Sequence, residues 1–350
     1  MSASSASKTA IITGVTGQDG AYLAQHLLSL GYRVVGAVRR TSTENFWRLA
    51  ELGVLGAPGF EIVDFDLGDA GSAIRLVAEH RPDELYNLAA QSFVSVSFQQ
   101  PIATADMTGL GALRLLEAVR IARPETRFYQ ASTSEMFGKV TVAPQNESTS
   151  FHPRSPYAFA KLMAHWATVN YRESYGIFAS SGILFNHESP LRGREFVTRK
   201  IASHVARVSL GETAPLELGS LDSLRDWGFA REYVVGMQAM LSHSVPETFV
   251  LATGRTASVR SFVELAHAVV GIRLEWEGEG VEEQARDAAT GELRVRVNPR
   301  FYRPAEVELL QGDASRALHE LGWKATTSLE GLCEIMVKAD IERAHKGQIF

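Results

Sequence analysis

The sequence predicts an α/β fold built on a doubly wound parallel sheet, together with a smaller mixed α/β substrate domain. Short, almost continuously apolar runs alternate along the first half of the chain with stretches whose apolar residues recur at helical spacing. A glycine-rich turn, "ITGVTGQDG", separates the first apolar run from the first helical stretch. Together these features indicate a Rossmann-like nucleotide-binding sheet.

The apolar runs are predicted strands, and the periodic stretches between them are predicted helices. The expected strands are 9–13, 33–38, 60–66, 84–90, 126–132 and 178–185. The expected helices are 19–31, 71–80, 111–122 and 155–176. A later strand-like run, 247–254, is a candidate to rejoin the same sheet.

The regular alternation ends after residue 186, where glycine, proline and charged residues become frequent. The segment 276–300 is acidic and irregular, and we expect a surface loop there. We therefore predict a nucleotide-binding domain from residues 1–185 plus about 226–254. A second, substrate-binding domain is predicted from about 186–225 plus 255–350.

Composition narrows the class of protein. The 350 residues are 45% hydrophobic and 21% charged, with a formal net charge of -5, which gives no electrostatic case for binding nucleic acid. The single cysteine, Cys333, excludes an internal disulfide and a metal site built from cysteines. The sequence has no apolar run of about 18 residues, so we expect a cytoplasmic protein that does not span a membrane.

The glycine turn predicts a cofactor site. Gly14, Gly17 and Gly20 stand between the first strand and the first helix, where glycine allows a tight turn and close approach of phosphate to the backbone. The N-terminus of the helix then offers free N–H groups to a pyrophosphate. The spacing is G-x-x-G-x-x-G, one residue longer between the first two glycines than the standard dinucleotide pattern.

The end of the second strand favours NADP. Arg39 and Arg40 stand where a site for NAD usually has an acid, and arginine suits a 2′-phosphate. The alternative is a solvated arginine pair. Asp66, after the third strand, is a candidate to accept a hydrogen bond from the adenine amino group, or else caps its own loop.

Tyr157 and Lys161 are candidate catalytic residues because they lie four apart on the longest predicted helix and so share a face. A lysine near a tyrosine lowers the phenol pKa from about 10, so the pair can exchange a proton with a sugar hydroxyl or ketone. This spacing alone is common. It becomes specific with the glycine turn and the hydroxyl-rich strand end "QASTSEMFG" upstream.

These motifs resemble the extended short-chain dehydrogenase/reductase superfamily and, more narrowly, its GDP-mannose 4,6-dehydratase family. The narrower resemblance rests on "GVTGQDG", "FYQASTSEMFGKV", "RSPYAFAKL", "RDWGFAREYV" and "FYRPAEVELLQGD", and it extends from Lys8 to about Asp340. It implies oxidation of the hexose at carbon 4, elimination of water across carbons 5 and 6, and reduction at carbon 6, with NADP regenerated.

Glu135 is the residue that separates this chemistry from simple oxidation, because elimination beside a ketone needs a second acid/base group. The resemblance assigns Glu135 that role, and Thr133 can orient the substrate or share a proton at the reacting centre. The alternative for Glu135 is a surface glutamate that opens a loop. The dTDP-glucose 4,6-dehydratases have Asp-Glu after the threonine, whereas Ser134 precedes the glutamate here and favours the GDP-mannose branch.

The resemblance also implies binding sets, and no metal site is expected. The cofactor set is Gly14, Thr16, Gly17, Gln18, Asp19, Gly20, Arg39, Asp66, Leu67, Leu88, Ala89, Ala90, Ser92, Tyr157, Lys161, His187 and Arg192. The substrate set is Ser92, Thr133, Glu135, Asn186, Val197, Lys200, Arg225, Arg303 and Glu306.

Several alternatives stay open at this point. "FWRLAEL" (46–52) resembles a loop that reaches a neighbouring subunit's cofactor in family tetramers, so a homodimer or tetramer is expected; the alternative is a surface helix with Phe46 and Trp47 packed inward. Phe93, Ala103 and Phe159 differ from the residues common in the family. The fit of the sugar is therefore open, and a GDP-manno-heptose is the alternative substrate. An epimerase or reductase, or a non-catalytic NADP sensor, fits less well because the Thr133, Glu135, Tyr157 and Lys161 set is complete.

Overall fold

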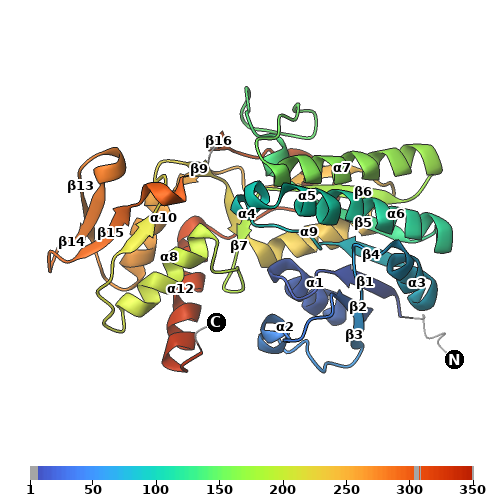
Figure 1. The fold of residues 1–350 in the computed structure, drawn as a ribbon, viewed down its shortest axis with the longest axis horizontal. Coiled ribbons are helices and arrows are strands. Elements are labelled where there is room, and N and C mark those ends of the chain that lie inside the picture. The colour runs from blue at the N-terminus through green and yellow to red at the C-terminus, as the bar shows by residue number, and fades with distance from the viewer. Residues whose placement is uncertain (1–6, 303–306, 308, 349–350) are drawn as a thin grey trace.

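The fold is organised around one large parallel sheet, which confirms the predicted fold class. The computed structural model describes residues 7–302, 307 and 309–348 (Figure 1). Within these residues the sheet has seven strands in the order β11-β6-β5-β4-β1-β2-β3. Their bounds are β1 (Thr9–Thr13), β2 (Arg33–Val38), β3 (Phe60–Asp64), β4 (Glu84–Asn87), β5 (Arg127–Thr133), β6 (Ala179–Leu184) and β11 (Thr248–Leu251). The pairing of β11 with β6 confirms the candidate strand at 247–254.

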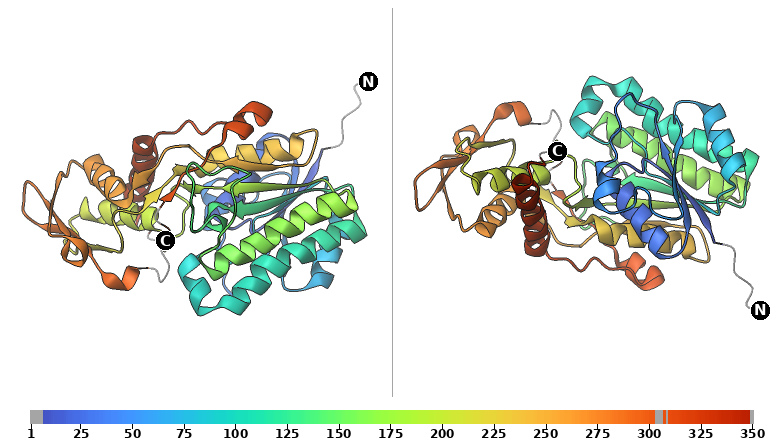
Figure 2. Two further views of the ribbon diagram at one scale, coloured as in Figure 1. Left: turned by 90° about the horizontal axis from the view of Figure 1, so that it is seen from above. Right: turned by 90° about the horizontal axis from the view of Figure 1, so that it is seen from below.

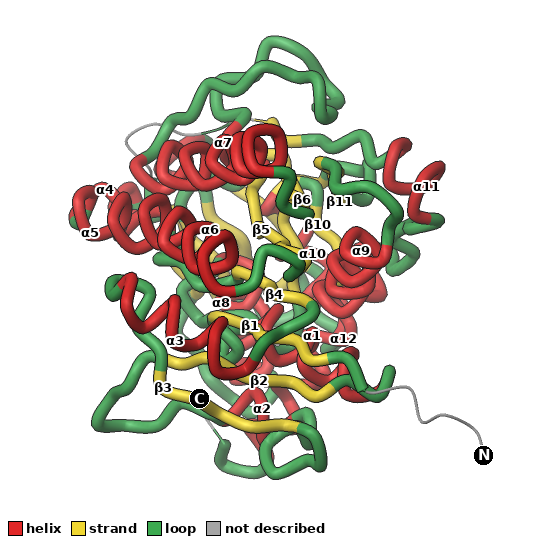
Figure 3. The backbone as a smooth tube through the Cα atoms, turned by 90° about the vertical axis from the view of Figure 1, so that its right-hand side faces the viewer, coloured by secondary structure: helices red, strands yellow, loops and turns green. Residues whose placement is uncertain are grey.

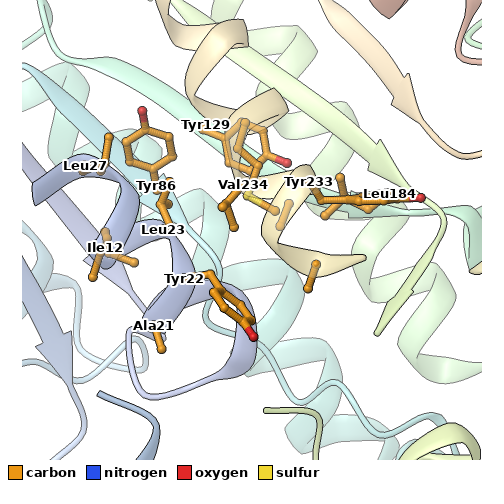
Figure 4. Close-up of a cluster of buried hydrophobic side chains, with 14 of the residues drawn as sticks. Ile12, Ala21, Tyr22, Leu23, Leu27, Tyr86, Tyr129, Leu184, Tyr233 and Val234 are labelled. Carbon is orange, nitrogen blue, oxygen red and sulfur yellow. The ribbon is translucent and has the colours of Figure 1, made fainter. Parts of the chain in front are cut away.

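Helices cover both faces of the sheet (Figure 3). One face carries α1 (Gln18–Ser29), α9 (Ala230–Ser242) and α11 (Ser315–Leu321); the other carries α3 (Ala70–His80), α6 (Gly111–Ala122) and α7 (Pro156–Tyr175). Consecutive side chains of a strand point to opposite faces, so Ile12 lies in one hydrophobic cluster and Ile11 in the other. Figure 4 shows the first cluster, where Tyr86 of β4 lies beside Tyr129 of β5, with ring centres 5.9 Å apart.

The strand order reverses between β1 and β4, which places a crevice at the carboxyl ends of these strands. From β1 the chain continues through α1 to β2 on one side, and from β4 it continues to β5 on the other. The β4–β5 pairing ends at Asn87 and Gln130, whereas the β5–β6 pairing runs on to Thr133 and Leu184. The last residues of β5 therefore extend beyond β4 into the crevice.

A smaller part of the molecule lies beside the large sheet (Figure 2). It contains a sheet of β13 (Leu274–Glu277), β14 (Gln284–Asp287), β15 (Leu293–Val297) and β8 (Leu216–Leu218). It also contains α8 (Val197–Val208), α10 (Val259–Val269) and α12 (Leu329–His345). These helices and strands share a second hydrophobic core, in which Cys333 is fully buried.

The prediction of a surface loop at 276–300 is wrong, because this segment forms β14, β15 and part of β13. The inward side chains, such as Ala285 and Val295, are small and fully buried. The outward side chains are charged and pair with each other, as Arg286 does with Glu277 at 2.7 Å. Because the outward residues are charged, the segment reads as an acidic loop, and the short alternation of buried residues is not evident from the sequence.

The remaining elements are short. They are the short helices α2 (Trp47–Glu51), α4 (Val94–Gln99) and α5 (Pro101–Thr104), the strands β7 (Asn186–Glu188), β9 (Leu224–Arg225), β10 (Trp227–Phe229), β12 (Ala257–Ser258) and β16 (Leu309–Leu310), and helical turns at Ala105–Leu110, Ser134–Met136, Gly280–Glu282 and Pro299–Phe301. Phe46 and Trp47 pack against the first hydrophobic cluster of their own chain. Within the described ranges, no helix is long and apolar enough to cross a membrane.

Candidate active site

The glycine turn after β1 has the close contacts expected of a phosphate-binding turn. Gly14 has a φ of 71°, and a Cβ there would lie 2.9 Å from the Ala89 nitrogen. A Cβ on Gly20 would lie 2.4 Å from the Gly14 oxygen, so α1 packs directly on the turn. Gly17 precedes the first residue of α1 and provides no side chain to cap it. Larger residues would fill this cradle, which fits a pyrophosphate held by backbone N–H groups.

A cavity of about 180 Å³, which we call the catalytic cavity, lies at the carboxyl ends of β1, β4, β5 and β6. It brings together most of the predicted cofactor and catalytic residues. Those that line it are Gly14, Gly17, Gln18, Asp19, Gly20, Leu88, Ala90, Ser92, Thr133, Glu135, Tyr157, Lys161, Asn186, His187 and Arg192.

Five members of the predicted cofactor set do not line this cavity: Thr16, Arg39, Asp66, Leu67 and Ala89. Arg39 is exposed at the end of β2. The Asp66 carboxylate accepts a hydrogen bond from the Gly68 nitrogen at 2.8 Å, as in the loop-capping alternative. Leu67 is buried in the hydrophobic cluster beneath α3 and α6. Their contact with a cofactor stays a prediction.

The start of α7 positions Tyr157 and Lys161. The Ser155 hydroxyl accepts from the Ala158 nitrogen at 3.1 Å, and Pro156 occupies the first helical turn, so the helix begins at a defined residue. Both functional side chains are at least nine-tenths buried. The Lys161 ammonium donates to the Ala131 carbonyl at 2.8 Å.

Glu135 enters the cavity from the end of β5. The Thr133 hydroxyl accepts from the Glu135 nitrogen at 3.3 Å and begins the helical turn at Ser134–Met136. Glu135 is half-buried and lines the same cavity as Tyr157. A carboxylate and a phenol therefore face one space from two different elements, which is the arrangement that two successive proton transfers need.

Burial has the largest effect on the pKa values of Tyr157 and Lys161. Burial raises the pKa of Tyr157, the charge of Glu135 raises it further, and hydrogen bonding to Thr133 opposes them. Burial also lowers the pKa of Lys161 to about 8. The expected lowering of the phenol pKa by the lysine is not seen, because the ammonium is directed to the Ala131 carbonyl.

Asp19 and His187 form a partly buried ion pair at the edge of the cavity. His187 Nε2 donates to Asp19 Oδ2 at 2.8 Å, and Nδ1 donates to the Phe185 carbonyl at 2.7 Å. Since both ring nitrogens face acceptors, the imidazole is positively charged. Burial opposes both charges, but their mutual attraction prevails: the pKa of Asp19 falls to about 2 and that of His187 is raised.

A second cavity of about 490 Å³, the substrate cavity, adjoins the first at Asn186 and Phe196. Of the predicted substrate residues, Asn186, Val197, Lys200 and Arg225 line it. Ser92, Thr133 and Glu135 line the catalytic cavity instead. Arg303 and Glu306 lie outside the described residues.

The sequence did not single out the aromatic residues of the substrate cavity. Phe196, Trp227 and Phe301 line it, and the Lys200 ammonium lies 3.7 Å from the centre of the Phe301 ring. These residues come from distant segments and carry no local signal. The quoted family motifs "RDWGFAREYV" and "FYRPAEVELLQGD" do contain Trp227 and Phe301, but nothing in those motifs marks either ring as part of a binding cavity.

The three departures from common family members fall in different places. Phe93 lines the substrate cavity and packs edge-on against Phe196, with ring centres 5.8 Å apart. Phe159 is 46% exposed on α7, and Ala103 is exposed on α5, so neither lines the two cavities. The expectation that Phe159 and Ala103 bear on the fit of the sugar is therefore wrong for direct contact.

Comparison with known proteins identifies the family. A family model described as GDP-mannose 4,6 dehydratase matches residues 11–336. The chain belongs to this family. A GDP-mannose 4,6-dehydratase of Sinorhizobium fredii is 53% identical over 339 residues, which cover 95% of this chain and 97% of that relative. The human GDP-mannose 4,6 dehydratase is 48% identical over 339 residues, covering 95% and 91%. The resemblance stated from the motifs is confirmed.

Solved structures share the fold of this GDP-mannose 4,6-dehydratase family member. A dTDP-glucose 4,6-dehydratase of Streptomyces venezuelae, solved with NAD bound, has a TM-score of 0.81 at 22% identity and covers 96% of this chain and 98% of its own. A UDP-glucose 4-epimerase of Thermotoga maritima has a TM-score of 0.80 at 22% identity, covering 97% and 99%. At these identities the likeness supports the architecture described above.

Proposed function

We propose that the protein converts GDP-D-mannose to GDP-4-keto-6-deoxy-D-mannose, with NADP used and regenerated within one reaction cycle. The observation that carries this proposal is that Glu135 faces the same cavity as Tyr157 and Lys161. Oxidation at carbon 4 needs the tyrosine and lysine alone. The added carboxylate supplies the group that elimination requires.

The chain's own residues fit a nicotinamide dinucleotide. The cradle at Gly14, Gly17 and Gly20 would hold the pyrophosphate, and Lys161 would hold the ribose beside the nicotinamide. The exposed Arg39 and Arg40 at the end of β2 favour a 2′-phosphate and therefore NADP. The chemistry that the cofactor supplies when bound is hydride transfer, from carbon 4 in the oxidation and to carbon 6 in the reduction.

Tyr157 acts first in the proposed cycle, as the base that removes the proton of the carbon 4 hydroxyl. Because its pKa is raised, Tyr157 is protonated in the ligand-free protein and must lose its proton before it can act as a base. The hydroxyl of Thr133 already favours the phenolate, and the ammonium of Lys161 would favour it further if it were directed to the phenol instead of the Ala131 carbonyl. Thr133 also stands at the end of β5 in a position to orient the sugar.

Glu135 acts second. The ketone at carbon 4 acidifies the proton on carbon 5, and the carboxylate removes that proton. The same carboxyl group then gives the proton to the hydroxyl that leaves carbon 6, so that water departs and a double bond joins carbons 5 and 6. The proton that Tyr157 removed from the carbon 4 hydroxyl is still held at this stage. Its transfer to carbon 5 completes the reduction at carbon 6 and regenerates the phenolate, so atoms and charge balance.

The substrate cavity is proposed to hold the GDP end of the substrate. Its volume lies within the usual range for small-molecule sites, and it opens toward the catalytic cavity at Asn186. Lys200 and Arg225 supply positive charge for the diphosphate. Arg303 and Glu306 remain proposed contacts from the family resemblance.

A homo-oligomer, dimer or tetramer, is also proposed, in the cytoplasm. Phe159, Met163 and Trp166 lie on one face of α7 and are 46%, 40% and 54% exposed. A large apolar face of this kind is typical of a contact between subunits.

The decisive experiment is incubation of the purified protein with GDP-mannose and NADP, followed by mass spectrometry. Loss of one water, with no accumulation of NADPH, is the expected result. Stoichiometric consumption of NADPH, in a parallel incubation supplied with NADPH in place of NADP, would indicate a reductase. Dehydration of a GDP-manno-heptose but not of GDP-mannose would replace the substrate, although the curated relatives named above carry the mannose name.

A further inference from the structure

Three successive backbone carbonyls beside the catalytic cavity are each held by an arginine. They belong to residues 190–192, in the turn that follows β7. Arg199 of α8 donates to the first and third carbonyls at 2.5 and 3.0 Å. Arg343 of α12 also donates to the first, at 2.8 Å, and Arg48 of α2 donates to the second, at 2.6 Å.

The two arginines from the smaller part of the molecule are themselves fixed by a shared carboxylate. Asp340 of α12 accepts from Arg199 at 2.7 Å and from Arg343 at 2.8 Å. All three side chains are more than nine-tenths buried. Arg343 also pairs with Glu51 of α2, in the part that carries the large sheet. Buried charges persist only when paired and hydrogen-bonded, and here the turn supplies the remaining acceptors.

The held turn leads directly to the phosphate-binding turn. The Ser189 hydroxyl donates to Gln18 Oε1 at 2.7 Å, and the Gln18 amide donates to the His187 carbonyl at 3.1 Å. Arg48, which holds the turn from one side, also donates to the Thr16 carbonyl at 3.2 Å. Arg192, the third residue of the turn, lines the catalytic cavity. The last turns of α12 are thus two contacts away from the cofactor cradle.

We propose that Arg343 and Asp340 are positioning residues for the cofactor. Neither lines the catalytic cavity. They act by fixing the turn at residues 189–192, which aligns Arg192 and Gln18 with the bound dinucleotide. The inference rests on the proposed NADP-dependent function, and it makes the C-terminal helix part of the cofactor site although the rest of that helix packs in the second core.

A purely structural role would behave differently from a positioning role. If the network only joined the two parts of the molecule, its loss would lower the melting temperature and weaken cofactor and substrate binding alike. If it aligns the turn, cofactor binding should weaken more than substrate binding. Arg192 of the turn lines the catalytic cavity, whereas no residue of 189–192 lines the substrate cavity, which only the flanking Glu188 and residues 194–196 reach from this segment.

The test is NADPH binding to full-length variants, measured by fluorescence titration beside the KM for GDP-mannose. Arg343→Met should weaken NADPH binding about 10-fold, and change the KM for GDP-mannose by less than about 2-fold. Arg343→Lys, which keeps the charge, should restore part of the affinity. Lys338→Met is the matched control, because Lys338 lies on the exposed side of α12 and pairs only with nearby Glu334 among the described ion pairs.

Two results would overturn the inference. One is unchanged NADPH affinity in folded Arg343→Met, with folding checked by circular dichroism. The other is an equal loss of NADPH and GDP-mannose binding that follows the loss of thermal stability in both Arg343 variants. If the wild-type protein does not bind NADPH, the proposed cofactor is refuted first, and this inference falls with it.

Discussion

The catalytic cavity and the substrate cavity are built in opposite ways. The catalytic cavity is formed by the carboxyl ends of parallel strands and the first turns of α7, and Tyr157 and Lys161 are almost fully buried there. The substrate cavity is formed by short strands, loops and helix ends from five distant segments, with aromatic rings on several sides. The position of the catalytic cavity follows from the topology of the sheet. The shape of the substrate cavity follows from individual side chains on several separate segments.

This difference indicates which residues the reaction requires and which residues can be substituted with an effect on binding alone. A residue at the end of β5 cannot move without shifting a strand that pairs with β4 as far as Gln130 and with β6 as far as Thr133. A ring such as Phe301 lines the cavity from the last residue of a short helical turn, which is not paired into a sheet. Substitutions in the first region should therefore remove the reaction, whereas those in the second should adjust binding.

The largest effect is expected from Glu135→Gln. The amide cannot accept the carbon 5 proton, so kcat should fall by about 10²- to 10⁴-fold while NADPH binding is retained. Mass spectrometry should show GDP-mannose that has not lost water. Glu125→Gln is the control, since Glu125 lies just before β5 at the opposite end of the strand and is exposed. Full activity of Glu135→Gln would remove this residue from the mechanism.

A smaller effect is expected from Lys200→Met in the substrate cavity. Loss of a charge-assisted contact to the diphosphate should raise the KM for GDP-mannose about 10- to 100-fold, with little change in kcat. Steady-state kinetics measure both constants. Lys324→Met, at an exposed lysine that lines neither cavity, should leave them unchanged. A fall in kcat without a rise in KM would place Lys200 in the chemistry instead.

Prediction from sequence succeeded where local patterns decide the structure. The four-residue spacing of Tyr157 and Lys161, with Ser155 and Pro156 before them, marks both the helix and its first turn. The alternation of apolar runs with helical stretches predicted the parallel sheet, and the three glycines predicted the tight turn after β1.

Prediction failed where contacts between distant segments decide the structure. The outer charges of β14 and β15 hid two strands. Trp227 and Phe301 reach the substrate cavity from segments with no shared pattern. Arg343 and Glu51 are 292 positions apart, so no local spacing predicts their pair. Such contacts depend on how the smaller part docks on the large sheet, which periodicity does not encode.

The core of the smaller part and the catalytic cavity should also differ in how their stability changes with acid. The rings of His204 on α8 and His267 on α10 have centres 6.1 Å apart and planes tilted by 51°. Burial lowers the pKa of His204 to about 3. Since the unfolded chain binds a proton below about pH 6.5 and the folded chain does not, stability from this pair falls as pH drops toward 3. The Asp19–His187 pair behaves oppositely over pH 7 to 5, because the raised pKa of His187 favours the folded state there.

The measurement is urea unfolding at pH 7 and pH 5. The free energy of unfolding of the wild type should fall by up to roughly 2 kcal/mol more than that of His204→Phe, which removes the titrating ring. His345→Gln, at an exposed position on α12, should follow the wild type. An equal fall in His204→Phe would assign the acid sensitivity to other groups.

The smallest effect is expected at Phe93, and it bears most directly on how the two cavities differ. Phe93→Ala removes an edge-on contact with Phe196, which stands where the cavities meet, and should raise the KM for GDP-mannose about 3- to 10-fold with kcat retained. Phe93→His, the residue common in the family, keeps a ring and should stay within about 2-fold of the wild type. Kinetics with GDP-mannose and a GDP-manno-heptose would show whether the space freed by alanine favours the larger sugar. A loss of kcat in both variants would mean that Phe93 acts on the catalytic cavity, and the separation between a fixed reaction centre and an adjustable binding cavity would fail at their junction.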